Sequence, residues 1–276
     1  MNATFRVARP RTTDLVFTNM SNASVTAPHH PWKRAALLSL LALAAVLIVA
    51  EFTRLDVWIS DHFYDANSGG WLVKHSGRAK AVFYNRPLQV IKLFGAVVLV
   101  ALLVPHRWVA PRWRFPKREI AVVFLALTLI PSLVGSLKAW TGMFCPRQLV
   151  RYGGTRPVVG LLEHAPENCC GGSKKRGRCW PAGHASGGFA LMSLWVLGRT
   201  RAQKVTGLAI GFTMGWTMGL YQMLNGNHYL SHTLVTMLLA WLVIVLLRAA
   251  IGPFDEGCAT PAWRWLRRKF PAAKTA

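Results

Sequence analysis

Charged residues are scarce in this chain of 276 residues, and acidic residues are the scarcest. Only 16% of the residues are charged, against roughly 25% in soluble domains, and Asp and Glu number 10 against 33 Lys and Arg. With 53% hydrophobic residues, this composition argues against a soluble domain and favours an integral membrane protein. The first 30 residues lack the apolar core of a signal peptide and are expected to form a flexible tail.

Long stretches without charge predict the membrane spans. Val205–Leu247 contains no Asp, Glu, Lys or Arg, and it is long enough for two crossings of about 20 residues each. The sequence predicts an all-α protein with six transmembrane helices, at about residues 35–52, 88–105, 119–137, 184–198, 205–223 and 230–248. The expected organisation is a basic tail over 1–34, a membrane domain over 35–250 with a loop at 138–183, and a basic tail over 251–276.

The net charge of +23 predicts the orientation in the membrane. Lys and Arg gather in both tails and in the second and fourth loops, and such clusters are typical of cytoplasmic segments. Both termini are therefore expected in the cytoplasm, and the other loops in the periplasm of a bacterial inner membrane. The third loop is also basic, which indicates an anionic substrate. No basic face with interleaved aromatic residues is present, so nucleic acid is not an expected partner.

Four of the five cysteines fall in the third loop: Cys145, Cys169, Cys170 and Cys179. An oxidising outer compartment would permit disulfides there, and four cysteines allow three full pairings. A zinc site is the alternative, although no Cys-x-x-Cys with matching histidine spacing occurs. Cys258 is expected to be cytoplasmic and free.

Polar residues are expected to converge at the outer ends of the spans. Lys138 closes the third span, Gly183-His184 opens the fourth, and His228 and His232 begin the sixth. A helix start attracts an anion through its free N–H groups and its dipole, and a histidine there can protonate a phosphate ester. His228 and His232 have a spacing that also suits zinc, but no carboxylate lies nearby as a third ligand. No metal and no cofactor are therefore expected.

These segments resemble the type 2 phosphatidic acid phosphatase superfamily, over roughly Ile120–Leu247. Its motifs are a lysine, six residues and Arg-Pro, then Pro-Ser-Gly-His, then Ser-Arg, five residues, His, three residues and Asp. The chain is especially similar to a bacterial subgroup with Cys-Pro after the lysine and Pro-Ala-Gly-His-Ala-Ser-Gly-Gly. The resemblance implies that the last four of six helices form the phosphatase-type bundle core.

The resemblance also implies roles for individual residues. Lys138 and the backbone N–H of Gly183 would bind phosphate oxygens. His184 would protonate the leaving alkoxide. His228 would attack phosphorus and form a phosphohistidine that water then cleaves.

The motifs depart from the family pattern at four places. Cys145-Pro146 stands where the family has Arg-Pro, Ala182 replaces the serine, and Tyr221-Gln222 replaces Ser-Arg. His232 takes the place of the aspartate that orients the nucleophile. Both arginines and the aspartate of the family motifs are thus absent from their expected positions.

Other residues are expected to substitute for them. Arg147 and Arg151 would supply positive charge to the phosphoryl group, and Gln222 would donate hydrogen bonds to it. His232 would orient His228 as a neutral tautomer that accepts its N–H. Glu163 or Glu167 could supply an acid from the loop.

The expected function is a metal-independent membrane phosphatase that hydrolyses a phosphomonoester or diphosphate of a lipid at the periplasmic face. Candidate substrates are polyprenyl phosphates, phosphatidic acid-type lipids and lipid A phosphates, and the expected partners are this substrate and membrane lipids. A lipid-to-lipid phosphotransferase on the same site and a non-catalytic lipid-phosphate-binding protein are the alternatives. The sequence leaves the oligomeric state open.

Overall fold

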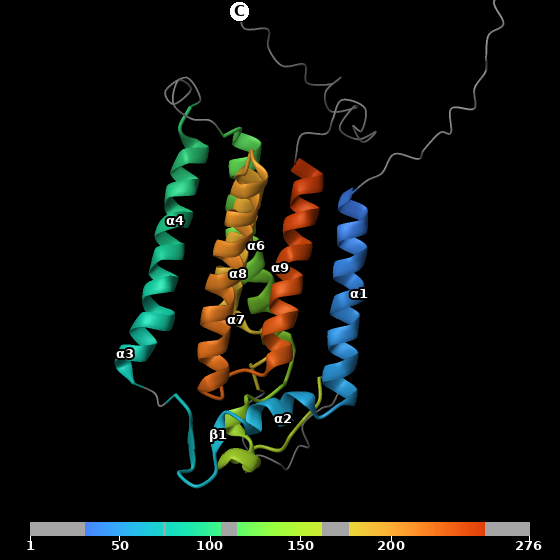
Figure 1. The fold of residues 1–276 in the computed structure, drawn as a ribbon, viewed down its shortest axis with the longest axis vertical. Helices are drawn as coiled ribbons and strands as arrows, with labels where there is room; N and C mark the ends of the chain where they lie inside the picture. The colour runs from blue at the N-terminus through green and yellow to red at the C-terminus, as the bar shows by residue number, and fades with distance from the viewer. Residues whose placement is uncertain (1–30, 74–75, 106–114, 162–176, 252–276) are drawn as a thin grey trace, which may run out of the picture. The chain divides into compact units, whose positions relative to one another are not determined.

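The computed structural model describes residues 31–73, 76–105, 115–161 and 177–251. Most of the two expected tails lies outside these residues, as do Cys169, Cys170, Cys258, Glu163 and Glu167. The described part is mainly helical, with one two-stranded sheet (Figure 1). This agrees with the prediction of an all-α membrane protein.

Apolar sequence forms the long helices. They are α1 (Pro31–Phe52), α4 (Arg86–Leu103), α6 (Lys117–Trp140), α8 (Arg201–Leu224) and α9 (Leu230–Ile251). A short helix α3 (Gly77–Lys80) leads through the π-helical turn η1 (Ala81–Asn85) into α4. Similarly, α7 (Gly183–Ala190) continues into the 3-10 segment η4 (Leu191–Leu197). A helix satisfies all of its interior backbone hydrogen bonds by itself, as hydrocarbon surroundings require.

Four helical segments in the described part are long and apolar enough to cross a membrane: Pro31–Phe52, Gly77–Leu103, Lys117–Trp140 and Leu230–Ile251. They correspond to the first, second, third and sixth predicted spans. The other two predicted spans are also helical, as α7 with η4 and as α8. The α7 and η4 segments are short, with 8 and 7 residues, and several glycines, threonines and glutamines make α8 less apolar. The count of six spans stays a prediction.

Short connecting elements pack together at one end of these helices (Figure 1). They are α2 (Leu55–Asp61), the antiparallel strands β1 (Tyr64–Asp65) and β2 (Gly70–Trp71), and the 3-10 turns η2 (Pro146–Gln148) and η3 (Val150–Tyr152). The rings of Tyr64, Trp71 and Tyr152 lie 5.0–5.4 Å apart between centroids. They pack with the buried side chains of Phe144 and Tyr229, and so join the segment after α1 to the segment after α6.

Close packing of α7 and η4 against α8 depends on glycine. A Cβ at Gly188 would lie 2.6 Å from the backbone N of Gly215, and a Cβ at Gly211 would lie 2.0 Å from the backbone N of Met192. Small residues let two membrane helices approach this closely. The contact fixes the separation between α7, which begins at Gly183-His184, and α8, which ends just before His228.

We expect Gly188→Ala to lower the free energy of unfolding by about 1–3 kcal/mol, because the new methyl group meets backbone that cannot yield. Gly187→Ala is the matched control, since a Cβ there would meet the side chain of Ile91 at an ordinary 3.7 Å. Thermal unfolding of detergent-purified variants measures the difference. Equal stability of the two variants would contradict this account of the helix contact.

Candidate active site

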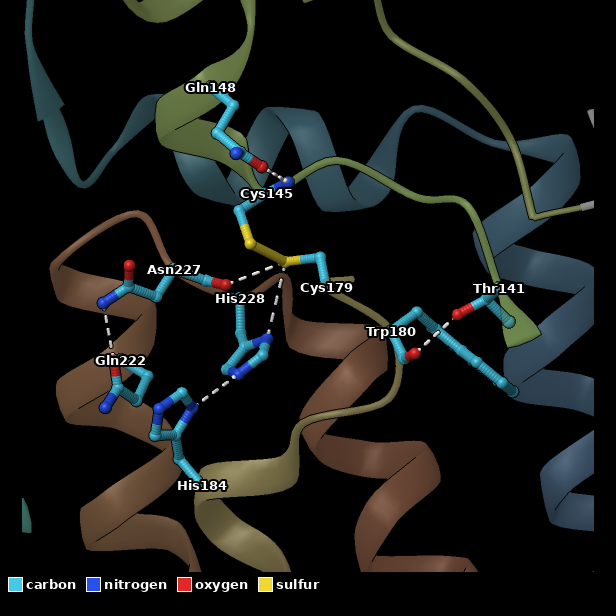
Figure 2. The surroundings of a disulfide bond; sticks show 9 residues. All are labelled: Thr141, Cys145, Gln148, Cys179, Trp180, His184, Gln222, Asn227 and His228. Atoms are coloured by element: carbon cyan, nitrogen blue, oxygen red, sulfur yellow. Dashed lines mark hydrogen bonds between the residues drawn. A yellow bond between two sulfur atoms is a disulfide. The ribbon is translucent and has the colours of Figure 1, made fainter. Parts of the chain in front are cut away.

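Three segments that are distant in sequence meet at one end of the helices: the end of α6, the start of α7 and the turn between α8 and α9. The rings of His184 and His228 face one another there (Figure 2), with Nδ1 of His184 3.0 Å from Nε2 of His228. His228 is almost fully buried, at 2% exposure, whereas His184 is half-buried. The structure thus brings together two histidines that the sequence places 44 residues apart.

Lys138 and Gly183 lie beside this pair. A Cβ at Gly183 would be 3.7 Å from Nζ of Lys138, so the ammonium group lies next to the first residue of α7. The hydroxyl of Thr141 donates to the carbonyl of Trp180 at 2.7 Å and joins the end of α6 to the segment before α7. The positive charges of Lys138, Arg147 and Lys80 all act on His184. A lysine, a helix N-terminus and added positive charge favour an anion.

The turn that carries His228 is held from several sides. Gly226 adopts a φ of 67°, which side chains disfavour, and a Cβ there would collide with the ring of Trp71. The backbone N–H of Arg147 donates to the Gly226 carbonyl at 2.9 Å. Asn227 donates to Gln222 twice, from its backbone N–H to the carbonyl at 2.8 Å and from its side chain to Oε1 at 2.5 Å. These contacts fix the backbone that leads into His228.

A disulfide joins Cys145 to Cys179, which selects one partner for Cys145 from the pairings that the sequence leaves open. The Cys179 sulfur lies 3.6 Å from Nδ1 of His228, on the side of the ring away from His184 (Figure 2). A disulfide sulfur carries no proton, so it can only accept here, and weakly. This arrangement suits the tautomer with the proton on Nδ1, which leaves a lone pair on Nε2.

His232 does not form the hydrogen bond expected of an orienting residue. It is fully buried, and neither of its ring nitrogens has a hydrogen-bond partner among the described residues. Its ring lies 5.8 Å from that of His228 and 5.1 Å from that of Tyr229, between centroids. Cys179, and not His232, therefore lies next to Nδ1 of His228.

Cys179, His228 and His232 offer donor atoms that lie within 4.8 Å of one another. Zinc binds cysteine as a thiolate, but the Cys179 sulfur is bonded to Cys145 and is a poor ligand in that form. Two histidines remain as ligands, fewer than zinc sites use. The donor set of the disulfide-bonded protein therefore does not fit a resident zinc ion.

The residues expected to replace the motif arginines are placed differently from one another. Arg147 is fixed by its backbone at the His228 turn, and its charge reaches His184. Arg151 is not brought to the histidines, because Asp61 binds its guanidinium at 2.8 and 2.6 Å. Arg151 in turn holds the pKa of the Asp61 carboxyl below its usual value. Gln222 is buried and accepts the hydrogen bond from Asn227, so it braces the turn.

Two residues that the sequence analysis did not single out also belong to this region. The ring of Tyr84, on the π-helical turn η1, meets that of His184 edge-on at 4.9 Å between centroids. Asp56, on α2, accepts a hydrogen bond from the backbone N–H of Ser231 at 3.0 Å. Neither has a motif spacing to the histidines. The scarcity of acidic residues was the one available signal for Asp56.

Burial is the main influence on the ionisation of His228. Burial, followed by the positive charge of Lys138, holds the pKa of His228 well below its usual value. His228 is therefore a neutral base at neutral pH, with its Nε2 lone pair directed at His184. A neutral imidazole is the nucleophilic form.

A lysine, a helix start and two facing histidines at one end of apolar helices define a membrane protein suited to phosphate esters. Residues 119–254 match the model of the PAP2 superfamily, and over this stretch the chain belongs to that superfamily. The family supports phosphatase or phosphotransferase activity on phosphate esters. The match includes α6 to α9 and leaves out α1, α2, the hairpin and α4. No curated protein and no solved structure matches the chain.

We expect Cys145→Ser to lower the free energy of unfolding by about 2–4 kcal/mol, because the disulfide closes a loop in the unfolded chain. Non-reducing peptide mapping of the wild type should recover the peptides of Cys145 and Cys179 joined together. Cys258→Ser is the control and should leave the unfolding temperature unchanged. A bond from Cys145 to Cys169 or Cys170 would contradict the pairing.

Proposed function

We propose that this chain is a membrane phosphatase that hydrolyses the phosphate ester of a lipid through a phosphohistidine. The observation that carries the proposal is the 3.0 Å approach of His184 Nδ1 to His228 Nε2, directly beside Lys138 and the first residue of α7. A candidate nucleophile and a candidate acid thus share one anion-attracting position.

Substrate binding uses charges and N–H groups that are already in place. Lys138 Nζ and the backbone N–H of Gly183 bind the phosphoryl oxygens, and the dipole of α7 adds to their effect. Arg147 contributes positive charge from the neighbouring turn. The phosphoryl group enters between the two imidazoles and takes the place of their mutual hydrogen bond. The proposal assigns no substrate contact to Arg151, because Asp61 holds its guanidinium.

The chemistry proceeds in two displacements. The Nε2 lone pair of His228 forms a bond to phosphorus while the bond from phosphorus to the alkoxide oxygen breaks. His184, protonated for this step, gives its proton to the departing oxygen. Water then attacks the phosphohistidine, His184 takes a proton from it, and His228 is released with inorganic phosphate. No metal ion takes part in either step.

The proposed location follows from charge. Basic residues of the second and fourth loops and of both tails are expected on the cytoplasmic side. The histidines lie at the other ends of these helices, which supports an active site at the outer face of a bacterial inner membrane. A lipid held in the outer leaflet brings its phosphate to this level.

The first experiment is phosphate release from a panel of lipid phosphates by detergent-purified protein. The panel holds a polyprenyl phosphate, a polyprenyl diphosphate, a phosphatidic acid and a lipid A phosphate. We expect His228→Ala to abolish release and His184→Ala to lower kcat by about 10²–10⁴-fold, the usual contribution of a general acid. A chelator should leave the rate unchanged.

His62→Ala is the matched control, because His62 is an exposed histidine directly after α2 whose ring nitrogen Nδ1 lies 2.8 Å from the Trp58 carbonyl. It should retain wild-type activity. Full activity of both His228→Ala and His184→Ala would refute the assigned roles. Binding of a lipid phosphate without turnover and without a trapped phosphohistidine would favour the non-catalytic alternative, and transfer to a second lipid would favour the phosphotransferase.

The pH dependence follows from the lowered pKa of His228. The nucleophile must be unprotonated, so the acid-side loss of activity occurs as the pH falls through this lowered value. We expect the acid limb of kcat/KM, corrected for ionisation of the substrate, to lie below the ordinary histidine value of about 6.5. Lys138→Gln should shift that limb to higher pH by removing a neighbouring positive charge. An acid limb above about 6.5 in the wild type would contradict the assignment.

A further inference from the structure

A carboxylate from the segment before the family-matched region lies against the start of α9. Asp56 accepts hydrogen bonds from both donors of Ser231, from the backbone N–H at 3.0 Å and from the hydroxyl through a very short contact. The two residues are 175 positions apart. Ser231 is buried and lies between His228 and His232 in the sequence.

The surroundings of Asp56 are unfavourable for a charge. With Ser231 it lines a cavity of about 190 Å³ between α1, α2 and α9, whose other lining residues are apolar, such as Val46, Val49 and Leu234. Burial raises the pKa of Asp56, while the two bonds from Ser231 oppose that rise. The ion pairs of the described residues are made by Asp61 and Glu119, not by Asp56. The free N–H groups and the positive dipole end of α9 compensate its charge instead.

This contact holds the backbone on the C-terminal side of His228, whereas other contacts hold it on the N-terminal side. Contacts of Gly226 and Asn227 hold the backbone on the N-terminal side of His228. On its C-terminal side the chain enters α9 at Leu230, where the first N–H groups have no partners within the helix. The Asp56 carboxylate binds one of these groups from outside, and so holds the first turn of α9.

Asp56 acts on the backbone and not on the imidazoles. Among the described residues, its side chain accepts hydrogen bonds from Ser231 alone, and Asp56 is not among the charges that shift the pKa of His228. The contact therefore differs from a carboxylate that bonds the nucleophile ring. It determines where His228 sits, not how basic His228 is.

We propose that Asp56 is a positioning residue of the active site, which clamps the first turn of α9 and thereby holds Nε2 of His228 in line with His184. This role rests on the proposed phosphatase function. It extends the site beyond residues 119–254 to a helix that the family match leaves out.

The test compares Asp56→Ala, Asp56→Asn and the matched control Asp61→Ala in the full-length protein. Asparagine can accept from the Ser231 N–H and donate to its hydroxyl, so it keeps both contacts without the charge. Asp61 is an acid on the same helix that bonds to Arg151 and Tyr152 and not to α9. Hydrogen exchange of the peptide over residues 229–236 reports the clamp, and kcat on the best lipid of the panel reports its effect.

Asp56→Ala should speed exchange in the first turn of α9 by about 10–100-fold, the loss expected for a hydrogen bond to a charged group. It should lower kcat by about 10–100-fold, the usual cost of a nucleophile displaced by an ångström, with KM little changed. Asp56→Asn should restore both to within about threefold of wild type. Asp61→Ala should change neither.

Three results would overturn the role of Asp56: unchanged exchange in Asp56→Ala, faster exchange with unchanged kcat, or a loss that Asp61→Ala or Asp56→Asn shares. If the wild type hydrolyses no member of the panel, the phosphatase proposal fails by itself. The exchange data then decide the clamp alone: faster exchange confined to the first turn of α9 supports it, and unchanged exchange refutes it.

Discussion

The site depends on the close approach of α7 to α8, which glycine makes possible. His184 stands at the start of α7, and His228 follows the end of α8, so the separation of the two helix backbones sets the distance between the two rings. Gly188 faces Gly215, and Gly211 faces Met192, with no room for a side chain between the backbones. In a membrane, where no hydrophobic effect drives helices together, such packing is itself a main source of association. The same contact that stabilises the fold thus also aligns the proposed nucleophile and acid.

Around this contact, the protein holds its proposed nucleophile, His228, by means other than those of the family motifs. Where the motif arginine would stand, Cys145 carries a disulfide to Cys179, whose sulfur adjoins His228. The atom beside Nδ1 of His228 is this sulfur, a weak neutral acceptor, and not a carboxylate. The turn is instead held through its backbone, by Arg147 before His228 and by Asp56 after it. Fixing the position of an imidazole and stabilising its positive charge are separate tasks. The contacts around His228 fix its position and place no carboxylate beside its ring.

The sequence was sufficient to predict the convergence of Lys138, His184 and His228. Successive spans cross the membrane in opposite directions, so the end of the third span and the starts of the fourth and sixth spans lie on the same side. It was also sufficient to predict four of the six expected spans, which the structure has as long apolar helices. It did not predict that Arg151 is held by Asp61, or that Tyr84 meets His184. These contacts join loops or helices far apart in sequence, and no periodicity or motif spacing encodes them. His232 stands at the motif position of the missing aspartate, yet its ring nitrogens have no hydrogen-bond partner among the described residues. Motif spacing predicts where the backbone of a residue lies, and not which atoms its side chain contacts.

The disulfide beside His228 links the active site to the biogenesis of the protein. In the predicted topology, the third loop starts on the reducing side of the membrane during synthesis, where Cys145 and Cys179 are thiols. The segments after α6 and before α7 are then untied, and the backbone around His228 lacks one of its supports. In the topology that the charge pattern predicts, the bond forms only after the loop has been translocated. A newly made chain would then complete the support of His228 on the side where its proposed substrates lie.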